Sequence, residues 1–326
     1  MKDKLHYVVA IALVFALYGC GDPTKTPLIG RPGGPYQMTF STLPLTPVAG
    51  ETTQLTQKLS YTNNGDPVQQ LHVLHERMIH NFIVNLDFSS FAHIHHEDFQ
   101  AITEHDRESA TLHFPYEFQR VGNYRIVSEF THKNRSWTKH FDIQVGDPSI
   151  TSEVVVDLNR RKSFGRYDAK LSVSPTLPVA GFETEFILEL ARDKQPVTDF
   201  SLILGSEIHV ALWRLDGRHF GHTHAYTPHM AAMMTKMHDR SIDPIMRAKA
   251  MTSMMIEMAE APAQLVFVGP RLPMRYVFAE PGTYAMFLQC APGGIAQVFK
   301  FMVKVVAYAD GLNTAIDAMT LPTMQH

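Results

Sequence analysis

The sequence predicts a mostly β chain of two tandem immunoglobulin-like β-sandwich domains, the second carrying a Met-rich helical insertion. Short segments rich in β-branched and aromatic residues alternate with turns such as Asn64-Gly65-Asp66-Pro67. The same features also recur in the same order in the two halves of the chain. About seven short strands in a domain of about a hundred residues are typical of an immunoglobulin-like sandwich.

The internal repeat is visible at three places. Residues 36–50 and 167–181 are identical at seven of fifteen positions, and residues 80–95 and 209–224 at six of sixteen. A Gly-x-Tyr motif then opens a long alternating run in each half, at Gly122 and at Gly282. We therefore predict a first sandwich at 36–148, a linker at 149–166, in which Glu153–Leu158 could add a strand, a second sandwich at 167–308 and a tail at 309–326.

The N-terminus predicts secretion. Lys2 and Lys4 precede an apolar run at 7–18 that is too short to span a bilayer and is typical of a signal peptide at 1–20. Its end, Leu17-Tyr18-Gly19-Cys20, resembles the lipobox of bacterial lipoproteins, which implies a lipid anchor on Cys20. Residues 21–35 are rich in Pro and Gly and predict a flexible tether. We expect a location in the bacterial cell envelope, facing the periplasm or exterior; a cleaved signal with an incidental cysteine is the alternative.

Charge and cysteine content exclude some classes. The net charge of −3 argues against nucleic acid as a partner, because nucleic-acid binding selects strongly basic surfaces. If Cys20 is lipidated, Cys290 stands alone, so no intramolecular disulfide is available and the core must hold the fold.

The extra length of the second half, 228–261, predicts two helices. Methionines recur there at i, i+3, i+4 and i+7, and Met and Ala are strong helix formers. Ser241-Ile242-Asp243-Pro244 marks a break. Such a stripe is more often hydrophobic packing than a metal site, although Met surfaces can also dock a protein.

An H-x12-H-x-H histidine set occurs once in each half. Alternate side chains on a strand share a face, so the second and third histidines of each set point the same way. The first histidine of each set begins an apolar row that we expect to face the core of its own domain. If the strands lie side by side, three imidazoles converge, as copper, zinc, iron or nickel sites require; structural hydrogen bonding and polar ligand recognition are the alternatives. The sets are His80, His93 and His95, and His209, His222 and His224.

The first half adds further donors. His75, Met78 and His96 lie beside the shared set, whereas Leu204 takes the place of His75 in the second half. The first set should therefore be the richer metal site. A nearby thioether favours Cu(I), so copper is the preferred metal, with zinc as the alternative.

The segment LHVLHERMIHNFIVNLDFSSFAHIHHEDF resembles the histidine-rich segment of YtkA-like and related small secreted bacterial β-sandwich proteins, often linked with copper or heavy-metal handling. The resemblance covers roughly thirty residues of the first half and, more weakly, the second. His96 departs from it, since the pattern tends to have Pro there. The resemblance implies these metal ligands: His75, Met78, His80, His93, His95, His209, His222 and His224.

Together these features predict an envelope-anchored, non-catalytic lipoprotein that binds a metal, with copper preferred, for sequestration or for delivery to a partner protein. The competing prediction is a protein-interaction module that docks through its Met-rich insertion and binds no metal. An enzyme is the least favoured class, because no nucleophile or acid–base set is evident and the spacing of His75 and His80 does not match HExxH.

Overall fold

The computed structural model describes residues 34–133, 135–147, 153–225, 243, 245–246 and 264–309. The protein is mostly β, as predicted. The predicted signal peptide with Cys20, nearly all of the tether, almost the whole insertion at 228–261 and nearly all of the tail lie outside the described residues. Within the described ranges, no helix has the length and apolar character needed to cross a membrane.

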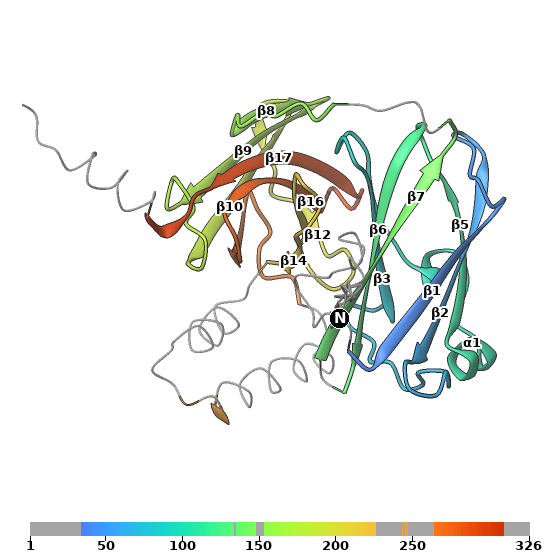
Figure 1. Ribbon diagram of the computed structural model, residues 1–326. Helices are drawn as coiled ribbons and strands as arrows, with labels where there is room; N and C mark the ends of the chain where they lie inside the picture. The colour runs from blue at the N-terminus through green and yellow to red at the C-terminus, as the bar shows by residue number, and fades with distance from the viewer. Residues whose placement is uncertain are drawn as a thin grey trace, which may run out of the picture.

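The first half forms two antiparallel sheets (Figure 1). One has the order β1-β2-β5 and the other β4-β3-β6-β7. A short 3-10 helix, η2 (His96–Asp98), and a short helix, α1 (Glu104–Ser109), lie between β4 and β5. The strands are β1 (Tyr36–Leu43), β2 (Thr52–Tyr61), β3 (Ile79–Asn85), β4 (Phe91–Ile94), β5 (Thr111–Glu117), β6 (Gly122–His132) and β7 (Arg135–Val145).

The second half repeats these pairings. β9, β10 and β15 pair as β1, β2 and β5 do, and β14, β13, β16 and β17 pair as β4, β3, β6 and β7 do. Three short strands, β8, β11 and β12, extend the sheet edges. The strands are β8 (Arg161–Phe164), β9 (Tyr167–Ser174), β10 (Glu183–Arg192), β11 (Gln195–Pro196), β12 (Phe200–Ser201), β13 (Ile208–Arg214), β14 (Phe220–His224), β15 (Arg271–Val277), β16 (Gly282–Pro292) and β17 (Gln297–Val305).

The linker differs from the prediction. Glu153–Leu158 was expected as a possible strand, and that expectation is wrong: the segment makes no sheet pairing. Val155 and Val156 are exposed, so their β-branched character is not used in a sheet. The strand of this region is β8, which pairs with β9.

Each half has its own hydrophobic core between its two sheets. In the first half, Leu55 and Phe114 of one sheet pack with Ile83 and Ile126 of the other. The second half has a larger cluster of the same kind, which includes the buried thiol of Cys290. These two cores fix the positions of the strands that carry the histidines.

A third cluster joins the halves. The sheet that contains β3 and β6 packs against the sheet that contains β13 and β16, which lie side by side in Figure 1. Every residue of β3 is buried, because one face meets its own core and the other meets the second half. The cluster consists of Phe82, Val84, Phe88, Val127, Ala211, Trp213, Phe220, Ala285, Phe287 and Met302.

The shared cluster corrects one expectation. The row that begins with His80 and continues through Phe82 and Val84 was expected to face its own domain core. It faces the other half instead. Alternation on a strand identifies which residues share a face, but it cannot say which of two apolar surroundings that face meets.

Polar contacts fix the same interface at its edge. Arg125 donates from Nη1 to the carbonyl of Gly217 at 2.5 Å, and its guanidinium also pairs with Asp142. Lys300 donates from Nζ to the carbonyl of Phe88 at 2.9 Å. Each half therefore presents a loop carbonyl that accepts a hydrogen bond from the other.

Candidate metal centre

The histidines lie at one end of the interface between the halves. In the second half, the antiparallel register of β13 and β14 places His209 opposite His224 and Ala211 opposite His222. In the first half, Phe82 on β3 lies opposite His93 on β4. Because all of these side chains lie on the faces that meet, the duplicated pattern produces two histidine sets in one buried place.

The first set, His80, His93 and His95, converges on one point. His80 Nδ1 lies 3.1 Å from His93 Nε2, and His95 Nε2 lies 3.0 Å from each of these atoms. All three residues are buried, with 3 %, 7 % and 0 % exposure. The predicted convergence of this set is present in the structure.

The second nitrogen of each ring, which points away from the other two rings, indicates whether the contacts between the rings can be hydrogen bonds. His80 Nε2 donates to the carbonyl of Leu74 at 3.0 Å, and His93 Nδ1 donates to Gln289 Oε1 at 3.0 Å. His95 Nδ1 donates to Asp98 Oδ2 at 2.9 Å. Each neutral ring carries one N–H, which is already used outward, so three bare lone pairs face one another. With neutral rings and the Gln289 amide in this orientation, no donor points into the space between the three nitrogens, so these atoms could hold a cation there.

A transition metal fits this spacing. Three atoms about 3 Å apart lie roughly 1.7–1.8 Å from their common centre, so bonds of about 2.0–2.1 Å place an ion about 1 Å out of their plane. Three ligands then lie on one side of the ion and a fourth direction stays open. The oxygens of Leu74, Gln289 and Asp98 orient the rings as outer partners of metal-bound histidines do.

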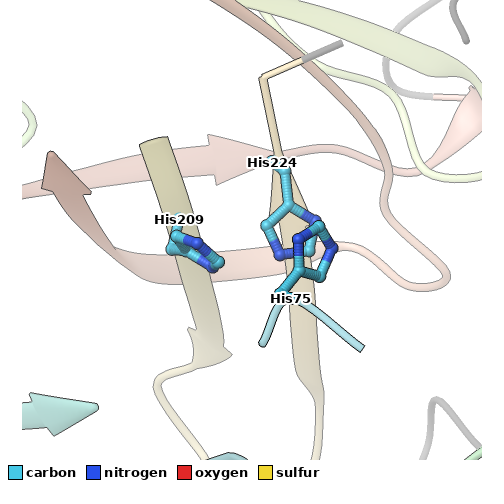
Figure 2. Close-up of side chains that lie close together, drawn as sticks. All are labelled: His75, His209 and His224. Atoms are coloured by element: carbon cyan, nitrogen blue, oxygen red, sulfur yellow. The ribbon is translucent and has the colours of Figure 1, made fainter. Parts of the chain in front are cut away.

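The second set draws on both halves. His75, His209 and His224 each offer a ring nitrogen within 4.8 Å of the others. Figure 2 shows His75 reaching from a loop of the first half to the two strands that carry His209 and His224. His209 Nε2 donates to the carbonyl of Ile203 at 2.8 Å, which leaves its Nδ1 as a lone pair 3.4 Å from His222 Nε2. His222 thus contacts this set through His209 and is counted with it, but it is not one of the three residues whose nitrogens converge.

His75 corrects the sequence interpretation. It was expected to enrich the first set, but its ring lies 3.9 Å, centre to centre, from that of His224. His75 and Glu76 form a two-residue turn between Leu74 and Arg77, with φ of 49° and 66°. Positive φ at both positions is the geometry of a tight type I′ turn, and it is strained for residues other than glycine. The turn projects His75 across the interface, so the expectation that the second set is the poorer one is wrong.

Two nitrogens in the second set have no partner. Nε2 of His75 and Nε2 of His224 are buried and make no hydrogen bond with any residue that the structure describes. A buried polar atom without a partner costs about 1–3 kcal/mol, so such atoms need a reason. As neutral imidazole nitrogens, both atoms are able to bind a cation.

Each set has one ring held by the other half. His93 is held by Gln289, and His222 Nδ1 donates to Glu129 Oε2 at 2.7 Å. Sequence reasoning missed Glu129, Gln289 and Asp98. A signal existed for the first two: each lies seven residues after the glycine that opens its strand, as a polar residue in an apolar run. Their role depends on the contact between halves, which the repeat alone does not predict.

Burial keeps the rings neutral. It lowers the pKa of His80, His93, His209 and His224 well below the usual value, and the neighbouring imidazoles lower it further. The pKa of His75 falls to about 4, mainly through burial. Neutral imidazole is the form that binds metals, so these five rings keep their lone pairs available at neutral pH.

The carboxylates behind the rings stay charged. Burial raises the pKa of Asp98, but hydrogen bonds and charge from His95 and Arg77 lower it more. Burial likewise raises the pKa of Glu129, but contacts with His222 and Ser136 lead to a net lowering. Each set therefore has one negative charge directly behind a ring.

Met78 and His96, which were noted beside the first set, and a third residue, His132, lie elsewhere. Met78 is buried in a core cluster of the first half, where its sulfur lies 3.5 Å from Arg107 Nη1. His96 accepts a hydrogen bond at Nδ1 from the backbone N–H of His113. His132 pairs with the hydroxyl of Tyr36 at 2.6 Å. The structure thus brings the predicted histidines together but turns Met78 into the core.

A family model described as a domain of unknown function, DUF8832, matches residues 33–147 and 162–307. The chain belongs to the DUF8832 family. The two matched stretches contain the described strands of the two halves, apart from the first residue of β8, and every histidine of the two sets. A comparison of this DUF8832 protein with curated protein sequences found no match.

Solved structures give distant likenesses only. A Salmonella alpha-2-macroglobulin is 12% identical with a TM-score of 0.26, over 85% of this chain and 15% of its own length. The Escherichia coli adhesin FdeC is 8% identical with a TM-score of 0.20, over 82% and 64%. The Yersinia pseudotuberculosis adhesin InvE is 8% identical with a TM-score of 0.23, over 82% and 58%. This chain spans only a small part of the macroglobulin, and scores this low do not establish a shared fold or function.

Proposed function

We propose that this protein binds a transition metal in the histidine sets between its two halves. The observation that carries the proposal is the first set, where three ring nitrogens lie 3.0–3.1 Å apart while the other nitrogen of each ring faces an oxygen. A site built only to pack or to hydrogen-bond would place a donor against each acceptor. Here the donors all point outward and the lone pairs all point inward.

Copper is the metal we propose first. The Met78 sulfur no longer supports it, because it lies in the core. The support is instead that the site consists of imidazoles, and that divalent-metal affinity at nitrogen sites is highest for copper. The resemblance to YtkA-like proteins favours the same metal. Zinc is the alternative, with the same three ligands and an open fourth position.

The context we propose is a cell-envelope lipoprotein with two immunoglobulin-like domains, anchored through Cys20. The signal-like run at 7–18 and the lipobox-like Leu17–Cys20 support the anchor. The repeated strand pairings support the domain type. In that setting the protein would sequester the ion or pass it to a partner protein, without catalysis.

The test is metal binding by the purified full-length chain in detergent. Cu(II), Cu(I) and Zn(II) are titrated against competing chelators, and bound metal is counted by elemental analysis. We expect tight binding that is lost from the first set when His93 and His95 are both replaced by Ala. His105→Ala is the matched control, because His105 is an exposed histidine on α1. Binding weaker than about micromolar, or equal loss in the control, would refute the proposal.

A further inference from the structure

We infer that the two histidine sets form one dinuclear centre, in which two metal ions lie close enough to interact. The inference rests on the proposed function and specifies its site. It follows from three observations: the rings of the two sets interleave, their number exceeds what one ion can bind, and each set has its own carboxylate.

Some rings of different sets are about as close as the more widely spaced rings of the same set. The centres of His93 and His209 lie 5.4 Å apart, and those of His80 and His222 lie 5.8 Å apart. Within the sets, His80 and His93 are 5.3 Å apart, and His209 and His222 are 5.6 Å apart. The imidazoles therefore make one continuous cluster with no layer of other side chains between its parts.

This closeness limits the separation of the ions. A metal bound in the plane of an imidazole lies about 3.2 Å from the ring centre, given bonds of about 2.0–2.1 Å. With 5.4 Å between His93 and His209, the two ions lie no more than about 12 Å apart. The ions reach this separation only if each one lies on the side of its ring that faces away from the other ring. Every other arrangement brings the two ions closer together.

One ion cannot serve the whole cluster. Metals held by imidazoles in tetrahedral geometry accept four ligands, and the first set already fills three such positions. Three further imidazoles of the second set converge within 4.8 Å of one another, and two of them, His75 and His224, have a buried nitrogen without any partner. A second ion would give both of these atoms a partner.

Charge is also divided between two ions. Asp98 lies behind His95 of the first set, and Glu129 lies behind His222 of the second. Two cations in a buried place repel each other strongly, so each needs a counter-charge nearby. The cluster provides one carboxylate for each set.

Cu(II) itself is the probe for the test, because two nearby Cu(II) ions alter each other's electron paramagnetic resonance spectrum. The full-length chain, His95→Ala and His224→Ala are each loaded with Cu(II), and bound copper is counted. We expect two ions in the unaltered chain and one in each variant. The doubly loaded spectrum should be broadened or diminished relative to the sum of the two single-ion spectra. His95→Gln and His224→Gln replace either variant that does not fold, as judged by circular dichroism.

Each other outcome has a definite meaning. Two ions whose spectrum equals the sum of the single-ion spectra would overturn the dinuclear centre and leave the proposed function intact. One ion in the unaltered chain, lost in both variants, would show a single shared site and overturn it as well. No bound ion at all would overturn the proposed function itself. His105→Ala should behave as the unaltered chain does.

Discussion

Replacing His75 by Leu in the metal-free protein tests how the buried histidines make stability depend on pH. Leu is the matched substitution, because Leu204 occupies the corresponding turn position in the second half with φ of 50°, against 49° for His75. The backbone of the turn is therefore compatible with the new side chain. What the change removes is one imidazole whose pKa is lowered to about 4, mainly by burial.

The direction and size of the change in stability follow from the number of protons that the folded and the unfolded chain each bind. Above pH 6.5 the ring is neutral in both the folded and the unfolded chain, and its contribution to stability is fully present. As the pH falls from 6.5 towards 4, only the unfolded chain takes up the proton, so the folded state loses stability. Each tenfold difference in proton affinity is worth about 1.36 kcal/mol. At pH 4.5 the loss from His75 alone is about 2–3 kcal/mol.

Urea unfolding at pH 7.5 and pH 4.5, with a chelator present, measures this loss. The unaltered protein should lose more stability than His75→Leu between the two pH values, by about 2–3 kcal/mol. At pH 7.5 the variant should be at least as stable, because it no longer buries the unpartnered Nε2. An equal drop in both proteins would refute the argument that His75 is held neutral at the interface.

Three further predictions follow from the same interface. Glu129→Gln should weaken metal binding at the second set by about 10–100-fold in competition titrations, because the charge behind His222 is lost; an unchanged affinity would exclude that role. Trp213→Ala should cost about 3–5 kcal/mol in chemical unfolding, since the ring is fully buried between the halves, and a loss below 1 kcal/mol would mean that the halves are not packed as described. Loading with Cu(II) to about a hundred times the dissociation constant should add about 2.7 kcal/mol of stability, seen as a raised Tm that a chelator reverses; an identical Tm with and without metal would argue against binding to the folded state.

Much of the fold could be predicted from the sequence because two strong signals agreed. Alternating apolar residues identified strands, and the repeat showed that the second half should pair its strands as the first does. The linker strand was misplaced because Glu153–Leu158 has β-branched residues but no partner strand, whereas Arg161–Phe164 has β9 beside it. Strand propensity is a weak guide where pairing decides.

Most histidines of the candidate site were predicted from the sequence, but the way in which the two halves bring them together was not. The shared pattern correctly joined His80, His93 and His95, because i, i+2 positions on a strand and its hairpin partner share a face. It could not assign His75 to the other half, since no local pattern encodes a contact between domains. For the same reason Glu129 and Gln289 were missed, and Met78 was included although it lies in the core, just before β3.

The contacts between the halves are reciprocal. His93 of the first half forms a hydrogen bond with Gln289 of the second half. The corresponding residues, His222 of the second half and Glu129 of the first, form the equivalent hydrogen bond. The carbonyls of Phe88 and Gly217, which occupy corresponding loops, each accept a bond from the other half. Such exchange is the mark of an isologous interface, the kind that joins the subunits of a two-fold symmetric dimer. The two halves therefore meet as the subunits of such a dimer do, within one chain. The symmetry is broken at one pair of turns, where His75 of the first half has Leu204 as its counterpart in the second.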